Sequence, residues 1–210
     1  MHMTKLTSLI VILLSLNFSL FSQNFLNTSG KSIINQNGDT IILRGMGLGG
    51  WMVQEGYMMA PGGFSSTQYQ IKDRLIELIG AEETDIFYDN WLSNHVRKID
   101  IDSMKQWGFN LVRAPIHYNL FTEPIEKEPF PNAYTQKEIG FTLLDSLLSW
   151  CEQNEIYLMI DLHAAPGGQG YNADISDYDP TKPSLWESTL NQNKTVELWR
   201  RIAERYKDKE

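Results

Sequence analysis

Short apolar runs alternate along the chain with longer segments in which apolar residues recur every three or four positions. Residues 109–116 and 155–162 are short runs rich in Val, Ile and Leu, which predicts buried strands. The longer segments, 67–107 and 135–154, carry helical spacing. Gly80 and Gly108 are expected helix stops within or after the first of them. A last helix is expected near the end of the chain, with an apolar face formed by Val196, Trp199, Ile202 and Tyr206.

A hairpin and a first sheet strand are expected before these helices. Residues 32–35 and 40–43 are β-branched runs on either side of Asn37 and Gly38, and Asn-Gly is a strong hairpin signal. The second run continues to Trp51 through four glycines, which mark a backbone that passes close to other groups. The order of strands and helices predicts an α/β fold with parallel strands. A complete (β/α)8 barrel takes roughly 250 residues. We therefore expect an N-terminal hairpin followed by a barrel truncated after about its third β/α unit.

The first 22 residues are expected to be a secretory signal peptide. Lys5 precedes an almost wholly apolar or small stretch from Leu6 to Phe21, which is short for a membrane span of about 20 residues. We expect no stable membrane anchor, a secreted or periplasmic bacterial protein, and a single domain over residues 23–210.

Composition narrows the function classes. The 210 residues are 42% hydrophobic, which suits a globular core, and their formal charge of -8 argues against nucleic acid as a partner. The one cysteine, Cys151, lies in an apolar helical stretch, so a buried small residue is the favoured interpretation.

Polar residues follow the end of each expected sheet strand. Trp51 and Glu55 follow the first, and Asp161 and His163 end the third. The second supplies Arg113, His117 and Tyr118. Because parallel strands end on one side of a sheet, these side chains are expected to converge there.

Residues alone leave the roles of these side chains open. Arg113 either holds a catalytic carboxylate or forms a structural ion pair, since an unpaired buried charge is costly. Asp161 and His163, two positions apart on one strand face, suggest a metal site with His117, or a hydrogen-bonded structural histidine. Glu55 either accepts hydrogen bonds from sugar hydroxyls or is a solvated acid. Trp51 either stacks on a pyranose ring or is buried.

Three motifs in order resemble glycoside hydrolase family 5, the cellulase and glucanase family. They are residues 42–51, residues 107–116 and residues 161–169, and the resemblance covers roughly residues 30–210. The segment from Gly49 to Tyr57 is most similar to the exo-β-1,3-glucanase branch. The resemblance implies substrate-binding roles for Glu55, Tyr57, Arg113, His163 and His117, with no metal and no cofactor. Trp51 joins the expected substrate-binding residues as a ring that could stack on a sugar.

The resemblance also implies retaining hydrolysis of a β-glucan-type polysaccharide by two glutamates. Those glutamates are expected beyond Glu210, so no catalytic residue is assigned within this chain. The expected protein is thus the N-terminal fragment of a secreted glycosidase, a monomer when full length and with a poly- or oligosaccharide as its partner. The alternative is a non-catalytic carbohydrate-binding protein derived from the same barrel.

Overall fold

The structure, a computed structural model, describes residues 25–59, 63 and 65–209. Within them the chain forms two compact units, residues 25–41 and 42–209. The expected signal peptide lies outside the described residues. No helix in the described part of the chain is both long enough and apolar enough to span a membrane.

The first unit is a small antiparallel hairpin whose position differs from the expected one. Strand β1 (Asn27–Ser29) pairs with β2 (Ser32–Ile34). The Asn37–Gly38 turn does form, with Gly38 at φ 84°, and it returns the chain as far as one bridge between Ile34 and Thr40. The predicted pairing with residues 40–43 therefore forms only in part, at Thr40 and Ile41, and β2 also pairs with the preceding segment as β1.

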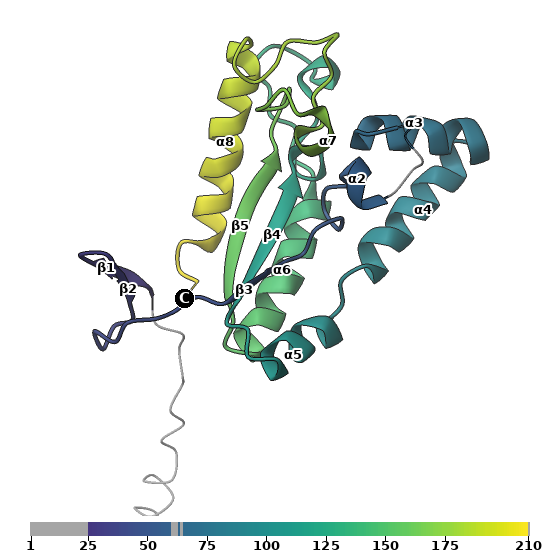
Figure 1. Ribbon diagram of the computed structural model, residues 1–210. Helices are drawn as coiled ribbons and strands as arrows, with labels where there is room; N and C mark the ends of the chain where they lie inside the picture. The colour runs from purple at the N-terminus through teal and green to yellow at the C-terminus, as the bar shows by residue number, and fades with distance from the viewer. Residues whose placement is uncertain (1–24, 60–62, 64, 210) are drawn as a thin grey trace, which may run out of the picture. The chain divides into compact units, whose positions relative to one another are not determined.

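The second unit is built on a parallel sheet in the order β3–β4–β5 (Figure 1). The strands are β3 (Gly45–Gly47), β4 (Leu111–His117) and β5 (Tyr157–Ala164). All three lie where the sequence predicted sheet strands, and their pairing is parallel as expected. The carboxyl ends of the strands therefore lie on one side of the sheet.

Segment 67–107, which was predicted to be helical, forms three helices between β3 and β4. They are α3 (Gln68–Ile79), α4 (Ala81–Asn94) and α5 (Lys98–Gln106), and a one-turn helix α2 (Gly56–Met59) precedes them. Helix α3 begins with a capping box, in which Thr67 accepts a hydrogen bond from the backbone N–H of Gln70. Gly80, at φ 86°, ends α3, and an ordinary side chain would be strained at that backbone conformation.

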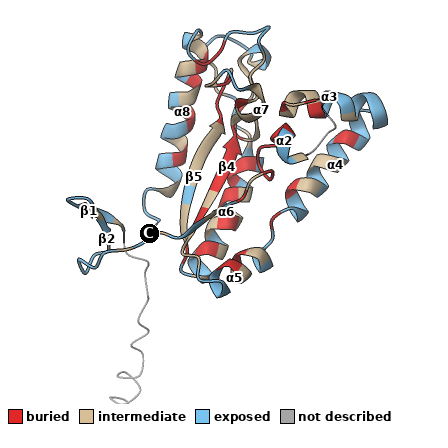
Figure 2. Ribbon diagram, in the orientation of Figure 1, coloured by how far each residue is buried: buried red, intermediate tan, exposed pale blue. Residues whose placement is uncertain are grey.

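One face of the sheet packs on helices and forms the core. Val112, Ala114 and Ile116 of β4 are fully buried against a cluster that includes Phe141 and Leu144 of α6 (Glu138–Gln153). Figure 2 shows this burial running along β4. Because side chains alternate across a strand, the intervening positions of β4 and β5 lie on the opposite face.

Helix α6 begins three residues later than predicted. Thr135, the expected start, donates its backbone N–H to Glu128 at 3.0 Å and its hydroxyl at 2.7 Å. These contacts, together with the short 3-10 helices η1 (Tyr118–Leu120) and η2 (Ile125–Lys127), order the loop before the helix. Cys151 of α6 is buried and unpaired, as expected for a core residue, and burial raises the pKa of its thiol to about 12.

The last helix, α8 (Thr189–Tyr206), turns only part of its predicted face to the core: Ile202 is buried and Tyr206 packs against the core, as expected. Leu198 and Ile202 are buried, together with Asn191 and Lys194, whereas Val196 is 69% exposed and Trp199 is 39% exposed. The apolar periodicity missed Asn191 and Lys194 because they are polar. Lys194 is buried only because a carboxylate accompanies it, and no pattern of apolar residues reports such a pair.

The loop from β5 to α8 folds back on itself above the strand end and includes the short helix α7 (Ala173–Ser176). Gly167 has φ 79°, and a Cβ there would lie 2.3 Å from the Asn191 side chain and 2.8 Å from the Pro183 carbonyl. Only glycine permits both this conformation and this close approach.

Candidate functional site

The strand ends bring together four of the side chains singled out in the sequence: Glu55, Arg113, Asp161 and His163. Arg113 donates from Nη2 to Oδ2 of Asp161, and the same Nη2 lies 3.0 Å from Nδ1 of His163. His163 Nδ1 is 2.9 Å from Asp161 Oδ2. On the other side of the imidazole, Nε2 lies 3.6 Å from Oε1 of Glu55. We call these four residues the strand-end cluster.

The strand register explains this convergence. Arg113 of β4 is paired with Met159 of β5, so Asp161 and His163 lie two and four positions further along the same face. The register shifts after Ile116, because Ile116 pairs with Leu162 and His117 pairs with Ala164, so His163 is the extra residue of β5 at this point. Glu55 enters from the segment that joins β3 to α2, where Gly56 allows the backbone to approach Ser66: its N–H donates to the Ser66 carbonyl at 2.9 Å.

The cluster is rich in hydrogen-bond acceptors and only partly enclosed. Glu55 is 3% exposed, whereas the side chains of Arg113 and His163 are 40% and 20% exposed. Two carboxylates and one guanidinium give a formal charge of -1 while the imidazole is neutral. Such a site can bind a ligand rich in hydroxyl donors, because a buried carboxylate needs hydrogen-bond partners.

Tyr57 borders the cluster through Glu55. Its side chain is on the surface, with the residue 61% exposed. Partial burial of the phenol and the negative charge of Glu55 raise its pKa. The hydroxyl is therefore a neutral donor next to the buried carboxylate, accessible to a ligand.

Trp51 is buried and does not present its ring to a ligand. It is 2% exposed, belongs to the core and donates its indole N–H to the Leu92 carbonyl at 2.8 Å. A ring enclosed in this way has no face left for a sugar, so the substrate-binding assignment of Trp51 needs correction. The residue fixes the segment that carries Glu55.

His117 does not join the strand-end cluster either. It is 1% exposed; Nδ1 accepts the backbone N–H of Asn119 at 3.1 Å, and Nε2 lies 2.9 Å from Oδ2 of Asp177. Because Nδ1 accepts, Nε2 carries the proton and donates it to Asp177. Both ring nitrogens are thus used, and the direct substrate contact expected for His117 is replaced by a structural one.

Asp177 and Gln169 have roles that sequence reasoning missed. Asp177 also accepts the backbone N–H of Tyr69, through Oδ1 at 2.9 Å, so its carboxylate ties the loop after β5 to the start of α3. Gln169 donates to the His163 carbonyl at 2.5 Å and accepts the Ala165 N–H at 3.0 Å. Gln169 stood within a recognised motif, whereas Asp177 lies in a long loop and carried no signal.

The loop after β5 also presents an aromatic ring. Trp186 is 69% exposed, and its indole N–H donates to the Gln169 carbonyl at 2.7 Å. Through Gln169 this ring is connected to the backbone of His163 by two successive hydrogen bonds. It is therefore exposed and held in place at the same time.

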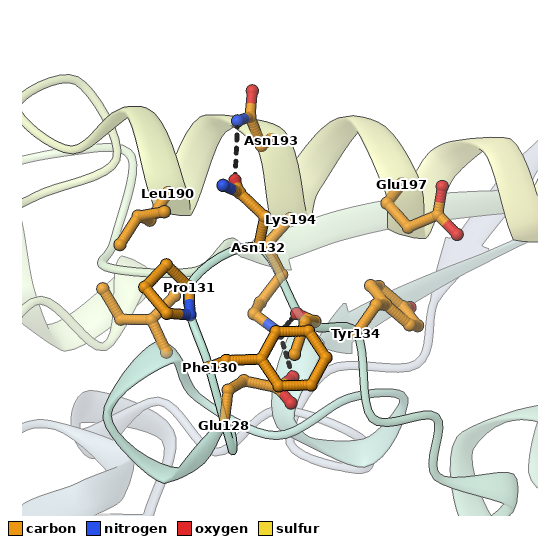
Figure 3. A pocket seen from close by; sticks show the side chains of 11 residues that line it. Glu128, Phe130, Pro131, Asn132, Tyr134, Leu190, Asn193, Lys194 and Glu197 are labelled. Atoms are coloured by element: carbon orange, nitrogen blue, oxygen red, sulfur yellow. Dashed lines mark hydrogen bonds and ion pairs between the residues drawn. The ribbon is translucent and has the colours of Figure 1, made fainter.

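Two cavities lie apart from the cluster. One, of about 350 Å³, is bordered by Asp177, Tyr69 and Tyr88. The other, of about 50 Å³, lies between α8 and the loop before α6 (Figure 3). In the second, Lys194 pairs with Glu128, and its remaining donors reach Thr122 Oγ1 and the Ala133 carbonyl, both at 3.2 Å. Every donor of the ammonium group has a partner, so this is a structural ion pair.

The metal alternative receives no geometric support from His117, which faces Asp177 rather than Asp161 or His163. Within residues 25–59, 63 and 65–209, no three His, Cys, Asp or Glu side chains form a group that could hold a metal ion.

Known proteins resemble this chain in sequence and in fold. Residues 67–210 match the family model described as Cellulase (glycosyl hydrolase family 5). The chain belongs to glycosyl hydrolase family 5. Membership implies the (β/α)8 barrel of that family, to which the parallel sheet of three strands conforms.

Two curated relatives in the family are fungal. The chain is 34% identical over 185 residues to a beta-xylosidase of Phanerodontia chrysosporium, covering 88% of this chain and 37% of that protein. It is 32% identical over 167 residues to probable glucan 1,3-beta-glucosidase A of Aspergillus niger, covering 79% and 38%. The chain thus spans well under half the length of these relatives. Their source gives no support to the expected bacterial origin.

A solved structure shows the same fold. The rutinosidase from Aspergillus niger superposes with a TM-score of 0.57 at 17% identity, covering 77% of this chain and 43% of that one. At this identity the match speaks for the fold alone.

Proposed function

We propose that the chain supplies the first three strand ends of a secreted, retaining glycosidase that cleaves a β-glucan-type polysaccharide. The observation that carries the proposal is the strand-end cluster, in which Glu55 and His163 approach to 3.6 Å with Arg113 behind them, in a family 5 chain. Glu55, Tyr57, Arg113 and His163 bind the sugar. The relatives named as glucan 1,3-beta-glucosidase support a β-1,3-linked glucan, and the one named beta-xylosidase supports a xylo-oligosaccharide as the competing substrate.

In retaining hydrolysis one carboxylic acid protonates the leaving oxygen while a second carboxylate attacks the anomeric carbon, from a separation of about 5–5.5 Å. The glutamates near the end of the chain do not suit these tasks. Glu187 accepts hydrogen bonds from Ser184, and Glu197 and Glu204 pair with Arg200 on α8. We assign both catalytic groups to glutamates outside the 210 residues, contributed by later strands of the barrel.

The coding sequence provides the first test. We expect the reading frame to continue past codon 210 to an Asn-Glu pair at a strand end and to a later strand-end glutamate. The product of the complete frame should hydrolyse β-1,3-glucan, and residues 1–210 alone should not. Turnover by the 210-residue chain, abolished by replacing one of its own glutamates, would overturn the assignment.

The second candidate is a carbohydrate-binding protein without hydrolytic activity. The observation in its favour is that the carboxylates of the strand-end cluster are engaged with Arg113 and His163. A stop codon at position 211 in undisturbed genomic sequence, with saturable binding of oligosaccharide and no hydrolysis, would select it.

A further inference from the structure

Asp161 received no role in the proposed function, yet it contacts both the guanidinium of Arg113 and the imidazole of His163. Its Oδ2 accepts from Arg113 Nη2 and lies 2.9 Å from His163 Nδ1. Arg113 Nη2 and His163 Nδ1 are themselves only 3.0 Å apart. Three polar atoms thus meet in a triangle, and the position of one hydrogen on the imidazole decides which contacts are favourable.

His163 Nδ1 can serve only one of its two neighbours. If Nδ1 lacks a hydrogen, it can accept from Arg113, but its lone pair then faces the carboxylate of Asp161. If Nδ1 carries the hydrogen, it donates to Asp161, and Arg113 keeps its own contact with the same oxygen. A bare Nδ1 held 2.9 Å from the anionic oxygen of Asp161 is repelled by it, whereas an Nδ1–H makes a charge-assisted hydrogen bond to that oxygen, so the second arrangement is favoured.

We propose that Asp161 is a positioning residue that holds His163 as the Nδ1–H tautomer. The consequence appears on the other side of the ring. Nε2 is then a bare acceptor, 3.6 Å from Oε1 of Glu55, which is also an acceptor. Two acceptors side by side form a binding position for donors of a ligand, in addition to the Tyr57 hydroxyl that lies against the Glu55 carboxylate. If the proposed function holds, neighbouring hydroxyl groups of one sugar ring supply them.

The alternative tautomer of His163 would remove this preference for hydrogen-bond donors in the ligand. With the hydrogen on Nε2, the imidazole would point its N–H at Glu55 and satisfy that carboxylate internally. The site would then offer one acceptor fewer to a hydroxyl-rich ligand. Asp161 thereby selects for donors in the ligand while touching no ligand atom itself.

The test reads the tautomer directly by ¹⁵N nuclear magnetic resonance of the imidazole nitrogens in histidine-labelled protein, near neutral pH. His163→Gln assigns the signals. A nitrogen that carries hydrogen and a bare one have widely different shifts, so wild type should show hydrogen on Nδ1 alone. Hydrogen on Nε2, whether alone or in a doubly protonated ring, would overturn the proposal.

Variants separate Asp161 from its neighbours. In Asp161→Leu the acceptor is gone and Arg113 becomes the partner of Nδ1, so the hydrogen should move to Nε2. Asp161→Asn should keep hydrogen on Nδ1, because its amide oxygen can take the place of Oδ2. The matched control is Asp145→Leu, which removes a carboxylate that also accepts from an arginine, Arg205 at 3.0 Å, and should leave the His163 signals unchanged.

An unchanged His163 tautomer in folded Asp161→Leu would contradict the proposal. If that variant does not fold, Arg113→Met decides: hydrogen retained on Nδ1 supports Asp161 as the controlling group, and its transfer to Nε2 overturns it. All of these ¹⁵N measurements are made without a sugar ligand. The tautomer can therefore be as proposed while the glycosidase assignment fails, or the reverse, and the two failures are distinguishable.

Discussion

His117 Nε2 lies 2.9 Å from Asp177 Oδ2, and this contact joins the end of β4 to the loop that follows β5. The other oxygen of the same carboxylate accepts the backbone N–H of Tyr69 at the start of α3. One side chain therefore holds three segments that are distant in sequence, at the side of the sheet where the strand-end cluster lies.

Asp177→Asn should lower the free energy of unfolding by about 1–3 kcal/mol. An amide has a single acceptor oxygen, so its NH2 group must face either the Tyr69 N–H or the His117 Nε2–H. Asparagine tolerates the left-handed backbone at φ 52°, so strain does not add to the loss. Urea unfolding measures the effect, and Asp174→Asn in the same loop is the control, expected within 0.5 kcal/mol of wild type. Equal losses of stability in both variants would refute the conclusion that the Asp177 carboxylate holds the three segments together.

Lys194→Met should be far more disruptive, by about 3–5 kcal/mol, because it leaves the Glu128 carboxylate buried without its cation. Both side chains of the pair are 3% exposed. Adding Glu128→Gln to that variant should recover part of the loss, which a double-mutant cycle measures. Lys72→Met removes an exposed pair with Asp85 and should cost at most about 1 kcal/mol. Similar costs for the two lysines would show that the buried pair is not the cause.

The same pair predicts an acid-dependent loss of stability. Burial raises the pKa of Glu128, but the hydrogen bonds from Lys194 and Thr135 together lower it by more than burial raises it. The pKa of Glu128 therefore lies below its usual value of 4.5. The resulting stabilisation is fully present above pH 4.5 and is lost as the pH falls through the lowered folded-state pKa. The stability difference between wild type and Glu128→Gln, from urea unfolding between pH 3 and pH 7, should shrink below pH 4.5. A constant difference would contradict the lowered pKa.

Trp186 is expected to form an aromatic wall of the sugar site. In the product of the complete reading frame, Trp186→Ala should weaken the binding of a β-1,3-linked oligosaccharide by ~1 kcal/mol, roughly fivefold in Kd. Titration calorimetry measures this. Trp107 is a matched control, since it is 68% exposed but precedes β4, at the amino ends of the strands. Binding that is insensitive to Trp186→Ala, or equally sensitive to Trp107→Ala, would remove Trp186 from the site.

The sequence predicted the positions of helices and strands better than it predicted which of their side chains are buried. The strands that carry Arg113 and His163 lie where apolar runs predicted them, because a buried parallel strand requires such a run. The buried face of α8 was predicted only in part, since Lys194 and Asn191 are buried through specific polar partners while Ile202 and Tyr206 face the core as expected. Val196 and Trp199 satisfied the helical spacing and are nevertheless exposed.

Position at a strand end identified the residues of the strand-end cluster. It did not distinguish side chains that converge in the cluster from side chains that are buried beside it. Glu55, Arg113 and His163 converge as expected, yet Trp51 and His117, equally close to strand ends, are buried and fully hydrogen-bonded. Side-chain direction at the end of a strand depends on local features such as the register shift that leaves His163 unpaired in β5, which the sequence does not reveal. The contacts of Asp177 with Tyr69 and His117 depend on the conformation of a long loop, which the spacing of apolar residues does not predict.

The most direct test of the account follows the His163 ¹⁵N signals while a β-1,3-linked glucose trisaccharide is added to the product of the complete reading frame. We predict a saturable shift of Nε2, because it accepts a sugar hydroxyl, and no shift of the buried His117 ring. Glu55→Gln should weaken the response by roughly tenfold or more, as expected for a hydrogen bond to a charged group. An Nε2 signal that does not move at saturating trisaccharide, or that moves no more than that of His117, would contradict the assignment of the strand-end cluster as a sugar site.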